Sequence, residues 1–237
     1  MEGYEAFKKL RADTGMTIRS FAAKAEISPR VLTYYESGEK SLLCIPTEKA
    51  VSLFSILTVS LPDFYFRYYP IKEEVNRRIE KWNAERTRIT DREQIKTRLK
   101  NRIFQMRSRA LISASEKEFL LTAYESQMSM MAKALGNRKK LTDTEYEQFV
   151  LPVLYLIKSA SKQNSVDQRT FVVKDAICHT EYSIRDLADI VGVSQQHLKG
   201  RLNKNELEKL HVETVLKLCL ALDISFESIF EVEVGSQ

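Results

Sequence analysis

Residues 16–38 read MTIRSFAAKAEISPRVLTYYESG, and residues 182–204 read YSIRDLADIVGVSQQHLKGRLNK. The two stretches align without a gap, and each residue of the second lies 166 positions after its counterpart in the first. After a one-residue deletion the alignment continues 165 positions apart, with apolar side chains at matching places in residues 53–64 and 218–229. Each copy therefore spans about sixty residues, the size of a small helical domain, and this internal repeat governs the interpretation of the whole chain.

The first copy predicts two helices joined by a tight turn. Thr17 is suited to cap the first of them. Apolar residues follow it at helical spacing, namely Ile18, Phe21, Ala22 and Ala25. Ser28 and Pro29 are typical of an N-cap and a first helical residue, so the second helix begins there and runs to Glu36. Gly38 then supplies the left-handed conformation that ends a helix.

The second of these helices has two faces. Its inner positions are Val31, Leu32 and Tyr35, and its outer positions are Arg30, Thr33 and Tyr34. Side chains on the outer face are free to meet base edges in a nucleic-acid groove.

The second copy repeats this pattern with its own caps. Ser183 and Asp186 form a capping-box pair, and Ser194 caps the next helix. The inner positions of the first helix are Leu187, Ala188 and Val191. Those of the second are His197, Leu198 and Arg201, and its outer positions are Gln195, Gln196, Lys199 and Gly200. Glutamine pairs well with adenine, and lysine with guanine or phosphate, although Gly200 weakens the helix by about 1 kcal/mol.

This pattern resembles the Cro and phage-repressor type of helix-turn-helix, the XRE family. The residues that carry the resemblance are Leu10, Arg11, Gly15, Met16, Thr17, Phe21, Ala22, Ala25, Ile27, Ser28, Leu32, Tyr35, Glu36 and Gly38. It covers about the first 66 residues and, more loosely and in degenerate form, residues 169–231. It implies small lambda-repressor-like domains that bind double-stranded DNA, with residues 29–36 in the major groove. Residues 195–202 are the second candidate recognition helix, which would bind either DNA or a protein.

An ion pair of the family tests the alignment. The resemblance implies that Arg11 pairs with Glu36, and the matching places of the second copy hold Ile177 and Leu202. Both charges are absent together, as expected when a buried ion pair is exchanged for an apolar contact.

The chain also departs from the family. Where many members carry a glutamine that touches DNA, this chain has Ile18 and Ile184, and Pro29 replaces another polar contact. We therefore expect DNA contacts from Thr17, Arg19, Ser28, Arg30, Thr33 and Tyr34 of the first copy, and from Ser183, Arg185, Gln195, Gln196 and Lys199 of the second.

Charge is unevenly distributed along the chain. The net charge is +5 with a pI near 9.0, which fits a nucleic-acid partner. Residues 70–165 carry 20 basic and 12 acidic residues (+8), whereas residues 1–69 carry +1 and residues 166–237 carry −4. The sequence has no apolar run long enough to span a membrane and no signal-peptide core, so we expect a cytoplasmic protein.

The middle segment predicts helices throughout. Residues 71–111 form either one long helix or two joined near Arg88, with Thr90 and Glu93 as a capping box. Two further capping boxes, Ser115 with Glu118 and Thr142 with Glu145, open helices that end at Gly136 and near Gln163. The first has an apolar face of Phe119, Leu120, Ala123, Met128, Met131 and Leu135. The second is nearly apolar all round, with Phe149, Leu151, Val153, Leu154, Leu156 and Ile157. Burial in a bundle or in a homodimer interface would explain such faces, and residues 159–168 read as a linker.

Catalytic and metal-binding signatures are absent from the sequence. It has no Gly-rich phosphate loop and no nucleophile with a positioned base, and its three cysteines, which we read as reduced thiols, lack metal-ligand spacing. We expect a non-enzymatic protein without cofactor or metal. The sequence thus predicts an all-α transcriptional regulator, such as a bacterial or phage repressor, with domains at residues 1–69, 70–165 and 166–237. The alternative is a protein-binding inhibitor or adaptor that uses the same fold and regulates its own promoter.

Overall fold

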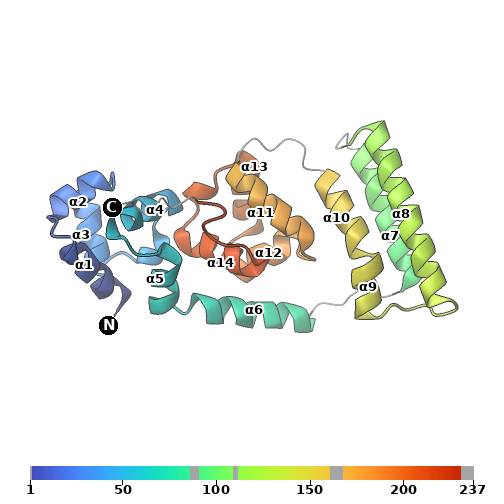
Figure 1. Ribbon diagram of the computed structural model, residues 1–237, viewed down its shortest axis with the longest axis horizontal. Helices are drawn as coiled ribbons and strands as arrows, with labels where there is room; N and C mark the ends of the chain where they lie inside the picture. The colour runs from blue at the N-terminus through green and yellow to red at the C-terminus, as the bar shows by residue number, and fades with distance from the viewer. Residues whose placement is uncertain (1, 86–90, 109–111, 161–167, 231–237) are drawn as a thin grey trace. The chain divides into compact units, whose positions relative to one another are not determined.

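The computed structural model describes residues 2–85, 91–108, 112–160 and 168–230, and these are all-α as predicted (Figure 1). The helices are α1 (Gly3–Asp13), α2 (Ile18–Lys24), α3 (Pro29–Glu36), α4 (Thr47–Leu57), α5 (Leu61–Tyr68), α6 (Ile71–Glu85), α7 (Arg92–Ser108), α8 (Ala114–Leu135), α9 (Asp143–Phe149), α10 (Leu151–Ala160), α11 (Gln168–His179), α12 (Ile184–Val191), α13 (Gln195–Lys204) and α14 (Val212–Leu222). Two 3-10 turns, η1 (Leu42–Cys44) and η2 (Leu207–Lys209), precede α4 and α14. None of the described helices is long and apolar enough to cross a bilayer.

The chain divides into two compact units. The first, which we call the paired unit, consists of residues 1–84, 167–173 and 182–237, and the second, the bundle unit, consists of residues 85–166 and 174–181. The aligned stretches 16–38 and 182–204, and the stretches 53–64 and 218–229 that follow them, lie in the paired unit. This grouping by contact differs from the three consecutive domains expected along the sequence, which remain a prediction about chain organisation.

The first copy forms its helices where the sequence predicts them. Thr17 accepts a hydrogen bond from the backbone N–H of Ser20, and Ser28 accepts one from Val31, so both predicted N-caps are confirmed. Gly38 adopts the expected left-handed conformation with φ 76°. The core beneath the helices is apolar and fully buried, and includes Phe7, Phe21, Leu32, Leu53, Phe54 and Tyr65. Burial of these side chains fixes how α3 is presented.

The second copy has the same local geometry. Ser183 and Asp186 form the predicted capping box, and Ser194 caps α13. The turn between the two helices is left-handed in both copies, at Glu26 (φ 54°) and at Gly192 (φ 81°), which are equivalent positions of the repeat. Among the predicted inner positions of α13, Leu198 is buried, Arg201 is half-buried and His197 differs most. It is exposed, so its predicted inward orientation is wrong.

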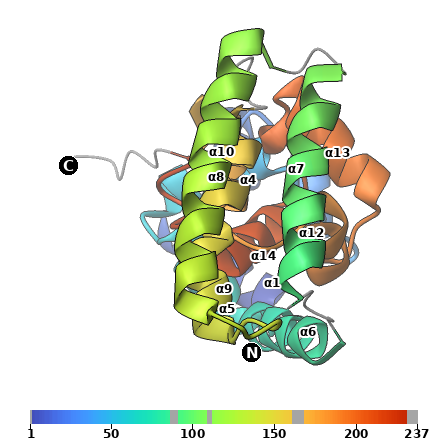
Figure 2. The same cartoon turned by 90° about the vertical axis from the view of Figure 1, so that its right-hand side faces the viewer.

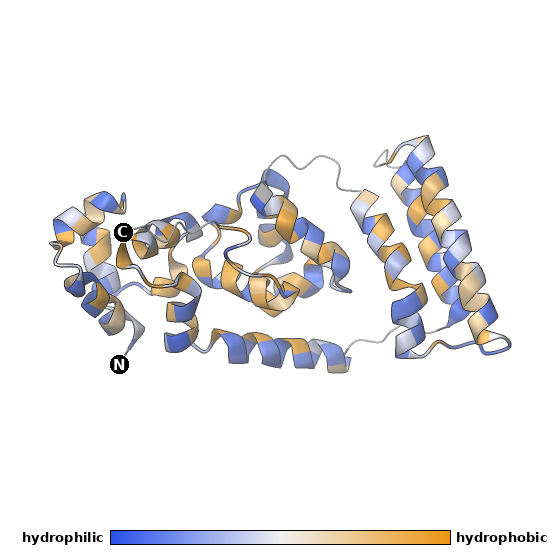
Figure 3. Cartoon of the chain, viewed as in Figure 1, coloured by the Kyte–Doolittle hydropathy of each residue, from blue (hydrophilic) through white to orange (hydrophobic). Residues whose placement is uncertain are grey.

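The bundle unit contains α7, α8, α9 and α10, and α7 and α8 run side by side (Figure 2). Its core is lined by apolar residues of all four helices, which Figure 3 shows along α8 and α10. The buried members include Ile95, Leu99, Ile103, Leu120, Met128, Met131, Val153 and Ile157. Gly136 ends α8 and the Thr142–Glu145 capping box opens α9, both as predicted.

Three expectations for this segment are corrected. The capping box that opens α8 is Ser113 with Glu116, two residues before the predicted Ser115 and Glu118. Phe119 is 62% exposed and lies off the predicted apolar face. The predicted long helix after Thr142 is split into α9 and α10 at Val150, because Pro152 has no N–H to continue the ladder.

Other predicted features fall on residues that are not described. Residues 71–108 contain two separate helices, α6 and α7, but the junction predicted near Arg88 and the capping residue Thr90 lie outside the described residues. Most of the predicted linker and the end of the helix near Gln163 lie outside them as well.

Candidate nucleic-acid interface

The outer face of α3 brings three of the predicted site residues together. Arg30 Nε donates to the Tyr34 hydroxyl at 2.6 Å, and the Arg30 guanidinium lies 5.5 Å from the centre of the Tyr34 ring. The Lys40 ammonium lies 5.5 Å from the same ring centre. Thr33 is exposed, and its hydroxyl donates to the Pro29 carbonyl at 3.0 Å. The face therefore presents two cations around one aromatic ring, a combination suited to anionic and stacked partners.

The ends of α2 and α3 hold the residues predicted to meet phosphates. Ser28 Oγ accepts the Val31 N–H at 3.2 Å, and Thr17 Oγ1 accepts the Ser20 N–H at 3.2 Å. Each cap satisfies one backbone amide of the helix that it opens, and the N-terminal end of a helix attracts anions. Arg19, in the first turn of α2, is exposed.

An ion pair ties α1 to the end of α3. Arg11 Nε donates to Glu36 Oε1 at 2.5 Å, and Arg11 Nη2 donates to Glu36 Oε2 at 3.2 Å, so the predicted pair is confirmed. The side chains of Arg11 and Glu36 are only 11% and 5% exposed. In the second copy the equivalent residues, Ile177 and Leu202, are both buried. The matching positions of the second copy are therefore apolar and buried where the first copy has an ion pair.

The outer face of α13 is polar and differs in composition from that of α3. Gln195, Gln196 and Lys199 are exposed, as predicted, and Ser194 Oγ accepts the His197 N–H at 3.1 Å. Arg201, predicted to point inward, is half-buried and donates to Glu206 at 2.7 Å. The amide of Gln196 and the ammonium of Lys199 therefore stand where the first copy has Arg30 and Thr33.

The two copies are joined to each other, which the sequence pattern did not reveal. Pro46 and His211 form an antiparallel bridge, in which Thr47 N donates to Leu210 O and Val212 N donates to Ile45 O, both at 2.9 Å. The Thr47 hydroxyl also donates to Leu210 O at 2.8 Å. In the sequence, this contact is marked only by the 165-residue offset of the repeat, which makes Ile45 and Leu210 equivalent positions.

Helix α6 anchors the second copy as well. Arg78 donates to the carbonyl of Asp189 at 2.9 Å, near the end of α12, and to Glu74 at 2.6 Å. Glu74 pairs at 2.7 Å with Lys217 of α14, whose side chain is 4% exposed. Burial favours a raised pKa for Glu74, but hydrogen bonding and charge from Lys217, with the charge of Arg78, hold that pKa below its ordinary value. Helix α6, which follows the first copy in the chain, is therefore bound to the second copy by a hydrogen bond and an ion pair.

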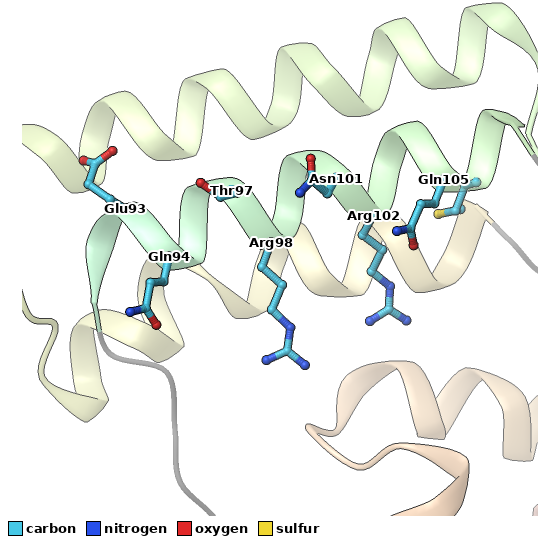
Figure 4. A pocket seen from close by; sticks show the side chains of 8 residues that line it. Glu93, Gln94, Thr97, Arg98, Asn101, Arg102 and Gln105 are labelled. Atoms are coloured by element: carbon cyan, nitrogen blue, oxygen red, sulfur yellow. The ribbon is translucent and has the colours of Figure 1, made fainter.

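A second polar surface lies on α7 of the bundle unit. One face of this helix lines an open pocket with Glu93, Gln94, Thr97, Arg98, Asn101, Arg102, Gln105 and Met106. Arg98 and Arg102 point in the same direction, one helical turn apart (Figure 4). Among the described residues, no group of three or more His, Cys, Asp or Glu side chains is placed to hold a metal ion.

Comparison with known proteins bears on the second copy. A family model described as a Cro/C1-type HTH DNA-binding domain matches residues 177–234, the copy that we expected to be degenerate. No curated protein and no solved structure matches the chain. The resemblance of the first copy to the same family stays a prediction. The chain therefore contains a Cro/C1-type helix-turn-helix DNA-binding domain at residues 177–234.

Proposed function

We propose that this chain is a sequence-specific transcriptional regulator that binds double-stranded DNA through both copies of its helix-turn-helix. The first copy is then a second Cro/C1-type domain, and the protein acts in the cytoplasm without catalysis, as a bacterial or mobile-element repressor does. Arg30, Thr33 and Tyr34 meet base edges from α3, and Gln195, Gln196 and Lys199 do so from α13.

Phosphates are held around these helices. Thr17, Arg19 and Ser28 lie at the helix starts of the first copy, and Ser183 and Arg185 lie at the equivalent places of the second. Amides at helix N-termini and cationic side chains are the usual phosphate ligands in such complexes. The basic segment of residues 70–165 adds affinity that does not depend on sequence. It is also where we place homodimerisation.

One observation carries this proposal. The domain matched at residues 177–234 and the unmatched first copy share the same caps, the same left-handed turn and the same hydrogen bond across it. That bond is donated by Ile27 N to Ala22 O in the first copy and by Val193 N to Ala188 O in the second, both at 3.0 Å. A DNA-binding assignment for one copy therefore supports the same assignment for the other.

A substitution at Arg30 tests the assignment of α3 as a recognition helix. DNA sites selected from a random double-stranded library are titrated with wild type and with Arg30→Ala by fluorescence anisotropy. We expect Arg30→Ala to lose about tenfold in discrimination at one base-pair position, since a bidentate arginine–guanine contact contributes about 1–3 kcal/mol. Arg67→Ala, also an exposed arginine of the paired unit, is the matched control and should keep the preference. Unchanged base preference in Arg30→Ala would argue against α3 as a reader.

A protein-binding adaptor or inhibitor is the second candidate. Two observations favour it: residues 166–237 carry a net charge of −4, and Phe104, Phe119 and Met130 of the bundle unit are 44%, 62% and 44% exposed. Acidic and apolar surfaces favour protein partners over phosphate. Arg30→Glu separates the two functions, because it should abolish DNA binding and spare a protein contact made on the bundle unit.

A further inference from the structure

The contact between the two copies is isologous. In the bridge at Pro46 and His211, Thr47 N donates to Leu210 O, and Val212 N donates to Ile45 O. Thr47 is equivalent to Val212, and Ile45 is equivalent to Leu210, both at an offset of 165 residues. Each copy therefore gives the other the same bond that it receives, which is the signature of a two-fold axis.

The packing around the bridge follows the same symmetry. Helix α4 contacts η2, α14 contacts η1, and α4 and α14 contact each other. The central side chains are buried, with Ile45 and Leu210 each 1% exposed and Thr47 and Val212 each fully buried. The interface is thus a buried contact within one chain, and α6 adds the ion pair from Glu74 to Lys217.

The same equivalence includes the two candidate reading helices. In each copy the reading helix is followed along the chain by the 3-10 turn and then by the bridge, so α3 and α13 are equivalent elements of the repeat. Dimeric helix-turn-helix proteins match their two-fold axis to that of an inverted repeat in DNA, with half-sites about one helical turn apart. A single chain of this protein already contains such a pair.

The two reading faces are chemically different. Arg30, Thr33 and Tyr34 of α3 correspond to Gln196, Lys199 and Gly200 of α13. Arginine favours guanine, glutamine favours adenine, and the tyrosine has no counterpart at the glycine. A pair of half-sites read by these two faces is therefore inverted in orientation and unequal in sequence.

We propose that the paired unit of one chain occupies both halves of a single inverted, asymmetric DNA site, with α3 in one half and α13 in the other. The inference rests on the proposed function and specifies its target. Because the halves differ, the protein binds in one orientation along the duplex, which a symmetric homodimer on a palindrome does not.

The test assigns each half-site to one helix. A random double-stranded DNA library is selected with the full chain, and the selected site is titrated with Arg30→Ala and with Gln196→Ala. We expect each variant to lose about tenfold in base discrimination in one half only, and the two variants to affect opposite halves. Arg67→Ala and Gln148→Ala, which remove the same residue types from exposed positions elsewhere, should alter neither half.

Half-site geometry provides the second readout. Inverting one half to make a direct repeat, or inserting five base pairs between the halves, should lower affinity about 100-fold, since two linked readers gain that much from matched spacing. If Arg30→Ala reduces base discrimination in both halves of the selected site and Gln196→Ala reduces it in neither, the inference is overturned and the proposed function is left intact. Equal affinity for inverted and direct halves would do the same. Recovery of no preferred sequence at all would overturn both.

Discussion

At the scale of single residues, the Arg11–Glu36 pair links α1 to the end of α3. Its two side chains are nearly buried, and the repeat replaces them with Ile177 and Leu202. Glu36→Leu alone should reduce the free energy of unfolding by about 3 kcal/mol, because it leaves a buried guanidinium without its partner. The double variant Arg11→Ile, Glu36→Leu should cost much less, about 1 kcal/mol, since it removes both buried charges together and leaves neither without a partner.

Urea denaturation of the wild type, the two single variants and the double variant measures this coupling as a double-mutant cycle. Additive costs in the double variant would mean that the two residues act independently, contrary to the geometry of the pair.

The Glu74–Lys217 pair predicts a dependence of stability on pH. The pKa of Glu74 is held below its ordinary value of 4.5 in the folded protein. The stabilisation that the ionised Glu74 provides is therefore complete at pH values above its ordinary pKa. It is lost as the pH falls through the pKa that Glu74 has in the folded protein. We expect Glu74→Gln to lower the free energy of unfolding at pH 7 and to flatten its fall on acidification.

Urea denaturation at a series of pH values measures this effect. Glu73→Gln, an exposed neighbour on the same helix, is the control. An acid dependence that is identical in Glu74→Gln and wild type would show that this carboxylate is not linked to folding.

At the scale of helices, we expect the N-caps of α3 and α13 to contribute equally to the stability of the protein. Ser28→Ala and Ser194→Ala each remove a hydroxyl that accepts a backbone N–H, so each should cost about 1 kcal/mol of stability. Ser55→Ala, an exposed serine within α4, is the control and should change stability by less than about 0.5 kcal/mol. A cost in one copy only would mean that the two turns, despite the same hydrogen bonds, are not energetically equivalent. Thermal or urea unfolding gives the comparison.

Helix starts were predictable because their signals are local. Thr17, Ser28, Ser183 and Ser194 each cap the helix that follows, and the sequence alone is enough to place such bonds. Predictions failed where several local signals compete. Two serines, Ser113 and Ser115, each precede a glutamate by three residues, and only the structure selects the earlier one.

Orientation about the helix axis was predictable only in part. The inner face of α3 follows the apolar period, whereas α13 has few apolar residues. His197 was placed inside by alignment with Val31 and is exposed. Polar side chains such as histidine are often exposed, and a small rotation of the helix brings a side chain at the edge of the inner face to the solvent. Alignment with the first copy therefore does not decide the burial of His197.

At the scale of the whole chain, the paired unit could not be predicted from the sequence. Its contacts join residues about 165 positions apart, and the bridge at Pro46 and His211 uses backbone groups that carry no side-chain signal. The sequence predicts α6 to be part of a central domain because of its position in the chain. Its ion pair with Lys217 and its bond to the Asp189 carbonyl instead bind it to the second copy. Long-range pairing of this kind depends on tertiary packing, which periodicity does not encode.

The most direct test of the central claim is the binding of the purified full chain to its library-selected DNA and to a scrambled duplex across a salt series. Phosphate contacts weaken steeply with salt and are shared by both duplexes, whereas base contacts belong to the selected site alone. The account predicts that the selected duplex stays bound at salt concentrations that release the scrambled one, by a factor of about 1,000 or more in affinity. Equal, steeply salt-dependent release of both duplexes would contradict it.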